Sequence, residues 1–241
     1  MKRMTIFVLT AVLMLGLAAC QASNDSGGTD NSPVRTESGQ SAQSSVQADG
    51  DTGTKNAEAS GTGKVLIAYF AVAQNSETDA VSSASVAEVD GKAKGLVQII
   101  AEDIQTVTGG DLFSIETSVD YPGDINDLID YASAEQKEDA RPELISHIEN
   151  LDEYDTVFVG YPLWWYDLPQ VMYSFFDEYD FSGKTIVPFD VHNGSRLSGT
   201  AETIQELEPK ASVITDGFAV SYNDAADAAD DVQDWLNGLG Y

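Results

Sequence analysis

The stretch Val157-Phe158-Val159-Gly160-Tyr161-Pro162-Leu163-Trp164-Trp165-Tyr166-Asp167-Leu168-Pro169 decides which fold the chain can adopt. Its first three residues are typical of a buried strand, and two prolines then bracket two tryptophans and a tyrosine. Because proline cannot donate a backbone hydrogen bond, we expect an irregular turn after Val159 instead of a continued strand. Several aromatic rings on a loop are unfavourable unless they pack on a neighbour or cover a ligand. A planar ligand is the sharper of these two interpretations.

Strand-like and helix-like segments alternate on both sides of this stretch. The predicted strands are 65–70, 111–116, 156–160, 185–189 and 212–220, the last interrupted near Asp216-Gly217. The predicted helices are 95–108, 124–138, 141–150, 168–179, 199–207 and a last one that Asn223 or Asp224 caps. This alternation predicts an α/β fold, a doubly wound five-stranded parallel sheet with helices on both faces. Ligands then bind beyond the carboxyl ends of the strands, in the loops after Phe70, Gly160 and Phe189.

A polar segment of about two dozen residues, 71–94, separates the first predicted strand from the first helix. Loops of this length inside a compact domain are usually functional or inserted. The segment is therefore a candidate part of the ligand site.

The first 63 residues read as export and tethering signals. Lys2 and Arg3 precede an apolar run that ends at Leu17-Ala18-Ala19-Cys20, and this pattern resembles the signal peptide and lipobox of bacterial lipoproteins. We expect residues 1–19 to be a signal peptide, Cys20 to be the lipidated end, 20–63 to be a disordered tether and 64–241 to be the folded domain. The alternative is a simple secretory signal with an incidental cysteine. Cys20 is the single cysteine, so no internal disulfide is expected.

The formal net charge of −28, from 40 acidic and 12 basic residues, limits the classes of partner that the protein can bind. It disfavours nucleic acid and anionic lipid surfaces, so membrane contact is expected through the lipid anchor only. Basic protein partners are attracted by such a surface. An acidic surface that only keeps an exported protein soluble is an equally good interpretation.

Short motifs along residues 64–241 carry a family resemblance. They are Lys64 to Tyr69, Gly110-Asp111-Leu112-Phe113, Arg141-Pro142, Tyr154-Asp155, Gly160-Tyr161-Pro162 with Trp164-Trp165, Tyr179-Asp180-Phe181-Ser182-Gly183-Lys184-Thr185-Ile186, and Pro188-Phe189 with His192. On these residues the domain resembles the flavodoxin-like family, and most closely a short-chain branch that occurs on bacterial lipoproteins. The resemblance implies an FMN-binding domain with strand order 2-1-3-4-5.

The resemblance assigns two loops to the flavin ring. Trp164 and Trp165 match the aromatic loop beside the isoalloxazine, and Pro162, Leu163 and Tyr166 flank it. The matching loop at the other edge of the ring is His192, Asn193 and Gly194. Polar groups there can hydrogen-bond the ring and shift its preferred oxidation state. The plainer interpretations are that at least one tryptophan packs as core and that His192 is a satisfied loop residue instead of a proton donor.

The resemblance assigns the FMN phosphate to residues after the first strand and at the start of the next helix, and the sequence departs from the family there. The matching positions are Ala71, Val72, Gly95, Leu96 and Val97, where the family places a hydroxyl and a Gly-Asn-Thr. Each missing hydrogen bond to a charged group is worth roughly 1.5 to 3 kcal/mol, so two losses weaken FMN by about a hundredfold. Candidate substitutes are Ser76, Thr78, Ser82, Ser83, Ser85, Lys92 and Lys94. At the ring, Tyr166 stands where relatives usually have glycine, and Val191 replaces a usual threonine.

Two functions are compatible with these observations. The first is FMN-dependent electron transfer or reduction at the cell surface, with a redox partner protein or a small acceptor such as a quinone. The second is a degenerate domain that keeps the fold, has lost tight FMN binding, and serves as a binding or scaffold module. No catalytic residue is assigned, and no histidine and carboxylate spacing suggests a metal site.

Overall fold

The computed structural model describes residues 63–72, 86–89 and 91–241, all within one compact unit. The predicted signal peptide, Cys20, and the tether up to residue 62 lie outside the described residues, as do the serines and the threonine of 73–85. Within the described part of the chain, no helix is long and apolar enough to cross a membrane.

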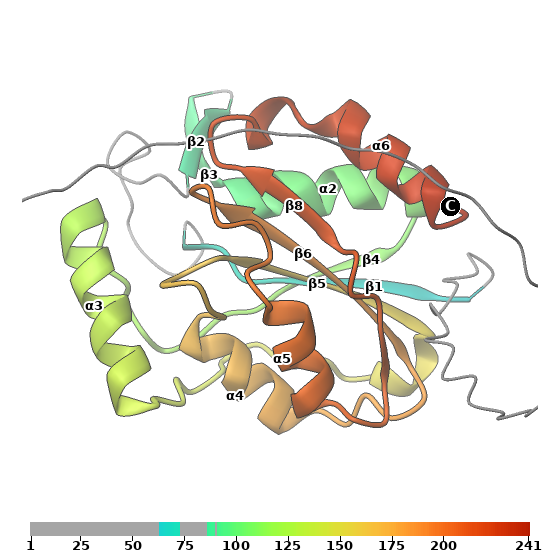
Figure 1. The fold of residues 1–241 in the computed structure, drawn as a ribbon, viewed down its shortest axis with the longest axis horizontal. Coiled ribbons are helices and arrows are strands. Elements are labelled where there is room, and N and C mark those ends of the chain that lie inside the picture. The colour runs from blue at the N-terminus through green and yellow to red at the C-terminus, as the bar shows by residue number, and fades with distance from the viewer. Residues whose placement is uncertain (1–62, 73–85, 90) are drawn as a thin grey trace, which may run out of the picture. The chain divides into compact units, whose positions relative to one another are not determined.

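A parallel sheet forms the centre of the domain (Figure 1). Its strands are β1 (Val65–Tyr69), β4 (Asp111–Ser114), β5 (Thr156–Pro162), β6 (Thr185–His192), β7 (Ser212–Val213) and β8 (Phe218–Ser221). The order is β4-β1-β5-β6-β7, and β8 also pairs with β6. Both β7 and β8 run parallel to β6, so they are two halves of one interrupted strand. Counted that way, the order is the predicted 2-1-3-4-5.

Helices cover both faces of the sheet. The helices are α2 (Leu96–Thr108), α3 (Ile125–Glu138), α4 (Gln170–Glu178), α5 (Thr200–Leu207) and α6 (Ala229–Gly238). Figure 1 shows α2 and α6 on one face and α4 and α5 on the other, with α3 standing beyond one end of the sheet. Alternate residues of β1 enter two separate cores: Leu66 packs toward α4 and α5, while Ile67 packs toward α2 and α6. Burial on both faces explains why the strand is apolar without interruption.

Four predicted elements differ from the structure. The proposed helix at 141–150 is wrong, because its backbone pairs with another segment: Ser118 N–H donates to Glu143 O at 3.0 Å and Ile145 N–H to Glu116 O at 2.9 Å. The stretch after Val159 does not leave the sheet at once. Instead β5 continues to Pro162 because β6 extends beside it to Val191, and only 164–167 forms a turn.

The third difference lies in the predicted loop at 71–94. Part of it is an antiparallel hairpin of β2 (Val86–Val89) and β3 (Lys92–Gly95), and β3 runs directly into α2. A short 3-10 turn, Ala225–Asp227, also precedes α6, so the last helix begins later than its predicted caps. The hairpin occupies the second half of the segment that was predicted to be a loop.

Candidate functional site

A pocket of about 280 Å³ lies at the carboxyl ends of β5 and β6, with α3 as its facing wall. The lining residues are Ile125, Leu128, Ile129, Ala132, Pro162, Leu163, Trp164, Trp165, Tyr166, Val191, His192, Asn193, Ser195 and Tyr222. Parallel strands end at one edge of the sheet, so two segments some 25 residues apart in sequence meet there. The structure thus brings together the predicted ring-binding residues, except Gly194.

The aromatic turn, defined here as Trp164 to Asp167, is a tight two-residue hairpin. Trp164 N–H donates to Asp167 O at 3.1 Å, and Asp167 N–H donates to Trp164 O at 2.9 Å. Trp165 and Tyr166 both have positive φ, 52° and 66°. This combination is typical of a type I′ turn, which normally carries Asn-Gly. Large aromatic residues in that conformation cost about 1 to 3 kcal/mol each, and such strain gathers at functional sites.

The two tryptophans of the turn have different roles. Trp164 packs edge to face on Phe70, at 5.7 Å between ring centres, and on Tyr121, at 5.4 Å. One tryptophan therefore does pack as core, as expected. Trp165 is 48% exposed, and its indole Nε1–H donates to Ile129 O in α3 at 3.1 Å. Trp165 is thus the residue that ties the turn to the facing wall of the pocket.

His192 contributes a neutral hydrogen-bond donor to the pocket. Gly194 N–H donates to His192 Nδ1 at 2.9 Å, so the ring proton of the neutral imidazole is on Nε2. Burial and the nearby Arg196 guanidinium lower the pKa of His192 below its usual value. Gly194 has a φ of 94°, which suits glycine and lets its N–H turn back toward the imidazole. The histidine therefore remains neutral at neutral pH.

A buried polar pair lies behind Trp164. Tyr121 is 1% exposed, and its hydroxyl donates to the Glu135 carboxylate of α3 at 3.3 Å. Burial raises the pKa of Glu135 to about 7, although the tyrosine hydrogen bond opposes the shift. This pair holds α3 against the aromatic cluster of Phe70, Tyr121 and Trp164.

A second carboxyl group near the pocket is buried without a partner. Asp190, in β6 two residues before His192, is 0% exposed, and neither carboxylate oxygen has a hydrogen-bond partner among the described residues. Burial raises the pKa of Asp190 to about 8. It lies opposite Tyr161, whose hydroxyl bonds to Thr200 Oγ1 at 2.7 Å and not to the carboxylate.

Sequence reasoning missed the α3 wall, Ser195 and Tyr222. Leu128 and Ala132 are four residues apart on one helical face, so an apolar stripe was available as a signal. That stripe does not say which part of the fold it faces. Tyr222 lies at the end of β8, where its N–H donates to His192 O at 2.9 Å, and only strand order reveals this neighbour.

The residues matched to the FMN phosphate do not line this pocket. Ala71, Val72, Leu96 and Val97 are between 0 and 3% exposed and belong to the cores, and Gly95 precedes α2 without a side-chain cap. Of the candidate cations, Lys94 forms an ion pair with Glu102, and Lys92 is exposed.

The residues present fit a flat ring better than a whole nucleotide. The pocket volume is just below the range of roughly 300 to 1,000 Å³ usual for small-molecule sites, and its walls are aromatic and apolar with few polar groups. The positions matched to the phosphate offer backbone N–H groups at the start of α2 and no side-chain donors. In the described ranges there is also no group of three residues that could hold a metal ion.

Comparisons with known proteins agree with this geometry. A sequence model of the family described as Flavodoxin matches residues 91–239, more than half of the chain. The chain is similar to the crystal structure of a candidate flavoprotein from Bacteroides eggerthii, at 26% identity and a TM-score of 0.55, over 73% of this chain and 97% of that one. A second, from Bacteroides uniformis, is 24% identical with a TM-score of 0.55, over 73% of this chain and 98% of that one. A search of the curated proteins finds no match. With its 2-1-3-4-5 sheet and this match over most of the domain, the chain belongs to the flavodoxin family.

Proposed function

We propose that the protein binds FMN with the isoalloxazine ring in the pocket between α3 and the ends of β5 and β6, and passes electrons or hydride to a partner. The observation that carries this proposal is the meeting of Pro162–Tyr166 with Val191–Asn193 around one aromatic-lined cavity. Membership of the flavodoxin family and likeness to a candidate flavoprotein support a flavin as the ligand.

A bound flavin would supply one- and two-electron chemistry, and the protein would supply the environment. Trp164, Trp165 and Tyr166 offer flat faces that exclude water from a ring. His192 Nε2–H is available as a neutral hydrogen-bond donor. A hydrogen bond from it would stabilise negative charge on an acceptor atom of the ligand without adding a full positive charge to the site. The net charge of −28 acts in the opposite sense, because it disfavours a negatively charged reduced ligand and lowers its reduction potential.

Titration of the full chain with FMN, followed by quenching of flavin fluorescence, tests the proposal. We expect saturable binding, and a fall in affinity for Trp165→Ala, because this ring is exposed at the pocket mouth and contributes little to the core. Trp235→Phe is the matched control, since Trp235 packs on Phe158 and Phe218 in the opposite core. No saturation at FMN concentrations far above those of a tight flavoprotein would contradict the proposal.

We also propose that the domain acts at the cell envelope, tethered through a lipid on Cys20, with a redox protein or a small acceptor such as a quinone as its partner. The support is the sequence pattern that ends at Cys20 and the polar segment that follows it. Cys20→Ser is expected to release the protein from the membrane fraction while its FMN affinity stays unchanged. Retention of the variant in that fraction would argue against the lipid anchor.

A second candidate function is favoured by the buried, apolar positions matched to the phosphate. If Ala71, Val72, Leu96 and Val97 serve only the cores, the domain is a binding or scaffold module without tight FMN. Isolation of the protein as a yellow complex would exclude this second function. A colourless protein that saturates only with high FMN would favour it.

A further inference from the structure

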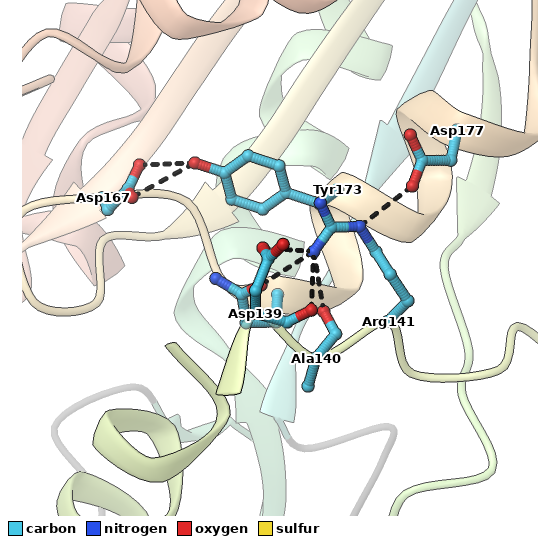
Figure 2. A network of polar contacts seen from close by, with 7 residues as sticks. Asp139, Ala140, Arg141, Asp167, Tyr173 and Asp177 are labelled. Atoms are coloured by element: carbon cyan, nitrogen blue, oxygen red, sulfur yellow. Dashed lines mark hydrogen bonds and ion pairs between the residues drawn. The ribbon is translucent and has the colours of Figure 1, made fainter. Parts of the chain in front are cut away.

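Two walls of the pocket converge on one polar network at α4. The first wall is the aromatic turn, which ends at Asp167, and the second is α3, which ends at Asp139. Figure 2 shows the Arg141 guanidinium between Asp177 on one side and Asp139 and Ala140 on the other, with Tyr173 reaching from it toward Asp167.

The turn is bound to α4 through Asp167. The Tyr173 hydroxyl donates to both carboxylate oxygens of Asp167, at 3.0 and 3.1 Å (Figure 2). One of these oxygens also accepts the Leu168 N–H at 2.8 Å. The Asp167 carboxylate at the end of the turn thus accepts hydrogen bonds from both Tyr173 and Leu168, and these bonds fix the conformation of the last residue of the turn.

The end of α3 is bound to the same helix through Arg141. Its guanidinium donates to Asp139 Oδ1 at 2.7 Å and to the carbonyls of Asp139 and Ala140 at 3.1 and 3.0 Å. It also donates to Gln170 Oε1 at 3.2 Å and, through Nε, to Asp177 Oδ2 at 2.9 Å, both on α4. Four of these contacts share Nη1, which has two hydrogens, and the fifth uses Nε, so one side of the guanidinium is shared among several acceptors.

The two halves meet at Tyr173. The Arg141 guanidinium lies over the Tyr173 ring at 5.0 Å from its centre, while the hydroxyl of the same ring reaches Asp167. A chain of contacts therefore runs from the end of α3 through Arg141 and Tyr173 to the aromatic turn. At the pocket mouth, the Trp165 indole N–H donates to Ile129 O, and this hydrogen bond links the aromatic turn to α3 a second time.

We propose that Arg141, Tyr173 and Asp167 are positioning residues that set the separation of the turn and α3, and so fit the pocket to a flat aromatic ligand. The ligand class rests on the proposed function, whereas the positioning itself is a property of the ligand-free protein. None of the three residues lines the pocket, so they act through Trp165 and α3.

Tyr173→Phe tests the proposal, because it keeps the ring over Arg141 and removes only the hydroxyl that reaches Asp167. Tyr179→Phe is the matched control: its hydroxyl accepts the Ile148 N–H at 2.8 Å, and among the described residues it has no hydrogen bond to the aromatic turn or to Arg141. The readout is the indole N–H region of a proton–nitrogen NMR spectrum, where the chain gives three signals. Trp165→Phe assigns the Trp165 signal, and the Trp235 indole on the opposite core is the internal reference.

We expect Tyr173→Phe to shift the Trp165 indole signal and speed its hydrogen exchange, and to weaken FMN binding by up to about tenfold. Tenfold is the upper limit, because the lost hydrogen bond to a charged group is also present in the ligand-free protein and only part of its energy enters the affinity. Tyr179→Phe is expected to do neither. Equal behaviour of the two variants in the indole spectrum would overturn the proposal. If the wild-type protein does not bind FMN, the proposed function fails, and the indole spectrum alone decides on the positioning.

A second variant tests whether the Arg141 contacts and the Tyr173–Asp167 hydrogen bond act as one network. Arg141→Lys keeps the charge but cannot reach Asp139, Gln170 and Asp177 together. Residues of one network are non-additive, so the double variant with Tyr173→Phe should disturb the Trp165 signal by less than the sum of the two single variants. Full additivity would mean that Arg141 and Tyr173 act independently, and this would contradict the proposal that they form one network.

Discussion

The carboxyl ends of β5 and β6 carry a strained aromatic turn, a neutral histidine and a buried carboxyl group that has no hydrogen-bond partner within the described ranges. The end of β1 and the start of α2 instead carry buried apolar side chains. We call these the ring end, residues 162–166 and 191–194, and the phosphate end, residues 71–72 and 95–97. Backbone strain and unpaired buried polar groups often gather at functional sites, although Asp139 also has a positive φ and Trp235 Nε1 is also unpaired among the described residues. Under the proposed function, the difference favours the ring end as the place where a ligand is held.

The largest expected effect comes from Asp190, the buried carboxyl beside the ring end. Its pKa in the fold, about 8, is above its usual value of 3.8, so the native protein retains a proton that the unfolded chain releases. The free energy of unfolding should therefore fall as the pH rises from about 4 to 8, by several kcal/mol at most, at about 1.4 kcal/mol per unit of pKa. Asp190→Asn does not titrate and should flatten that fall, measured by urea unfolding at pH 5 to 9.

Glu135→Gln is the control for this pH dependence, because Glu135 is the other buried carboxyl group near the pocket with a strongly raised pKa. Its contribution should be lost over a lower window, from about pH 4.5 to 7. A pH profile that keeps its wild-type slope in Asp190→Asn would show that the carboxyl group finds a partner or water in solution.

The next effect separates the two tryptophans of the ring end. Trp164→Ala removes a ring that packs on the fully buried Phe70 and Tyr121, so we expect about 3 kcal/mol loss in the free energy of unfolding. Trp165→Ala removes a half-exposed ring and should cost about 1 kcal/mol while still weakening FMN. Urea unfolding and FMN titration of both variants give the comparison. Equal stability losses would mean that both rings belong to the core.

At the phosphate end, Val97→Thr and Ala71→Ser restore the hydroxyls that the family resemblance calls for. Val97 is 1% exposed in the core with α6, so a hydroxyl there should cost about 1 to 3 kcal/mol of stability unless it finds a partner. FMN affinity should stay within about threefold of wild type if the position serves only packing. A gain of tenfold or more in affinity would show that the phosphate does lie at the start of α2.

Much of the fold could be predicted, because the apolar runs of β1, β5 and β6 and the turn residues between helices are local signals. The interrupted last strand, 212–220, was visible from Asp216-Gly217 alone. The helix expected at 141–150 was wrong because its partner, residues 116–118, is distant in sequence. The match of a family model from residue 91 onward includes the ring end and leaves Ala71 and Val72 outside it.

The candidate site could be predicted only in part, because some of its walls also depend on contacts between residues distant in sequence. Trp164, Trp165 and His192 stand out by residue type, and strand order brings their loops together. The α3 wall and the Arg141 network depend on how a helix docks at the end of the sheet, which no local pattern encodes. The positive φ of Trp165 and Tyr166 could not be predicted either, because turns of this type are normally recognised by an Asn-Gly sequence, which is absent here.

The smallest expected effect is the ratio of the affinities for FMN and riboflavin, which share the ring and differ in the phosphate. If neither side chains nor the backbone N–H groups at the start of α2 hold the phosphate, FMN should bind less than about tenfold more tightly than riboflavin, since one good hydrogen bond to the phosphate would exceed that ratio. Parallel titrations of the full chain at two salt concentrations measure it. The acidic surface repels the phosphate, so the ratio should rise with salt. A ratio of a hundred or more would instead show that the phosphate is held, and alanine in place of Ser76, Thr78 and Ser82 would then test whether residues 73–85 supply the donors.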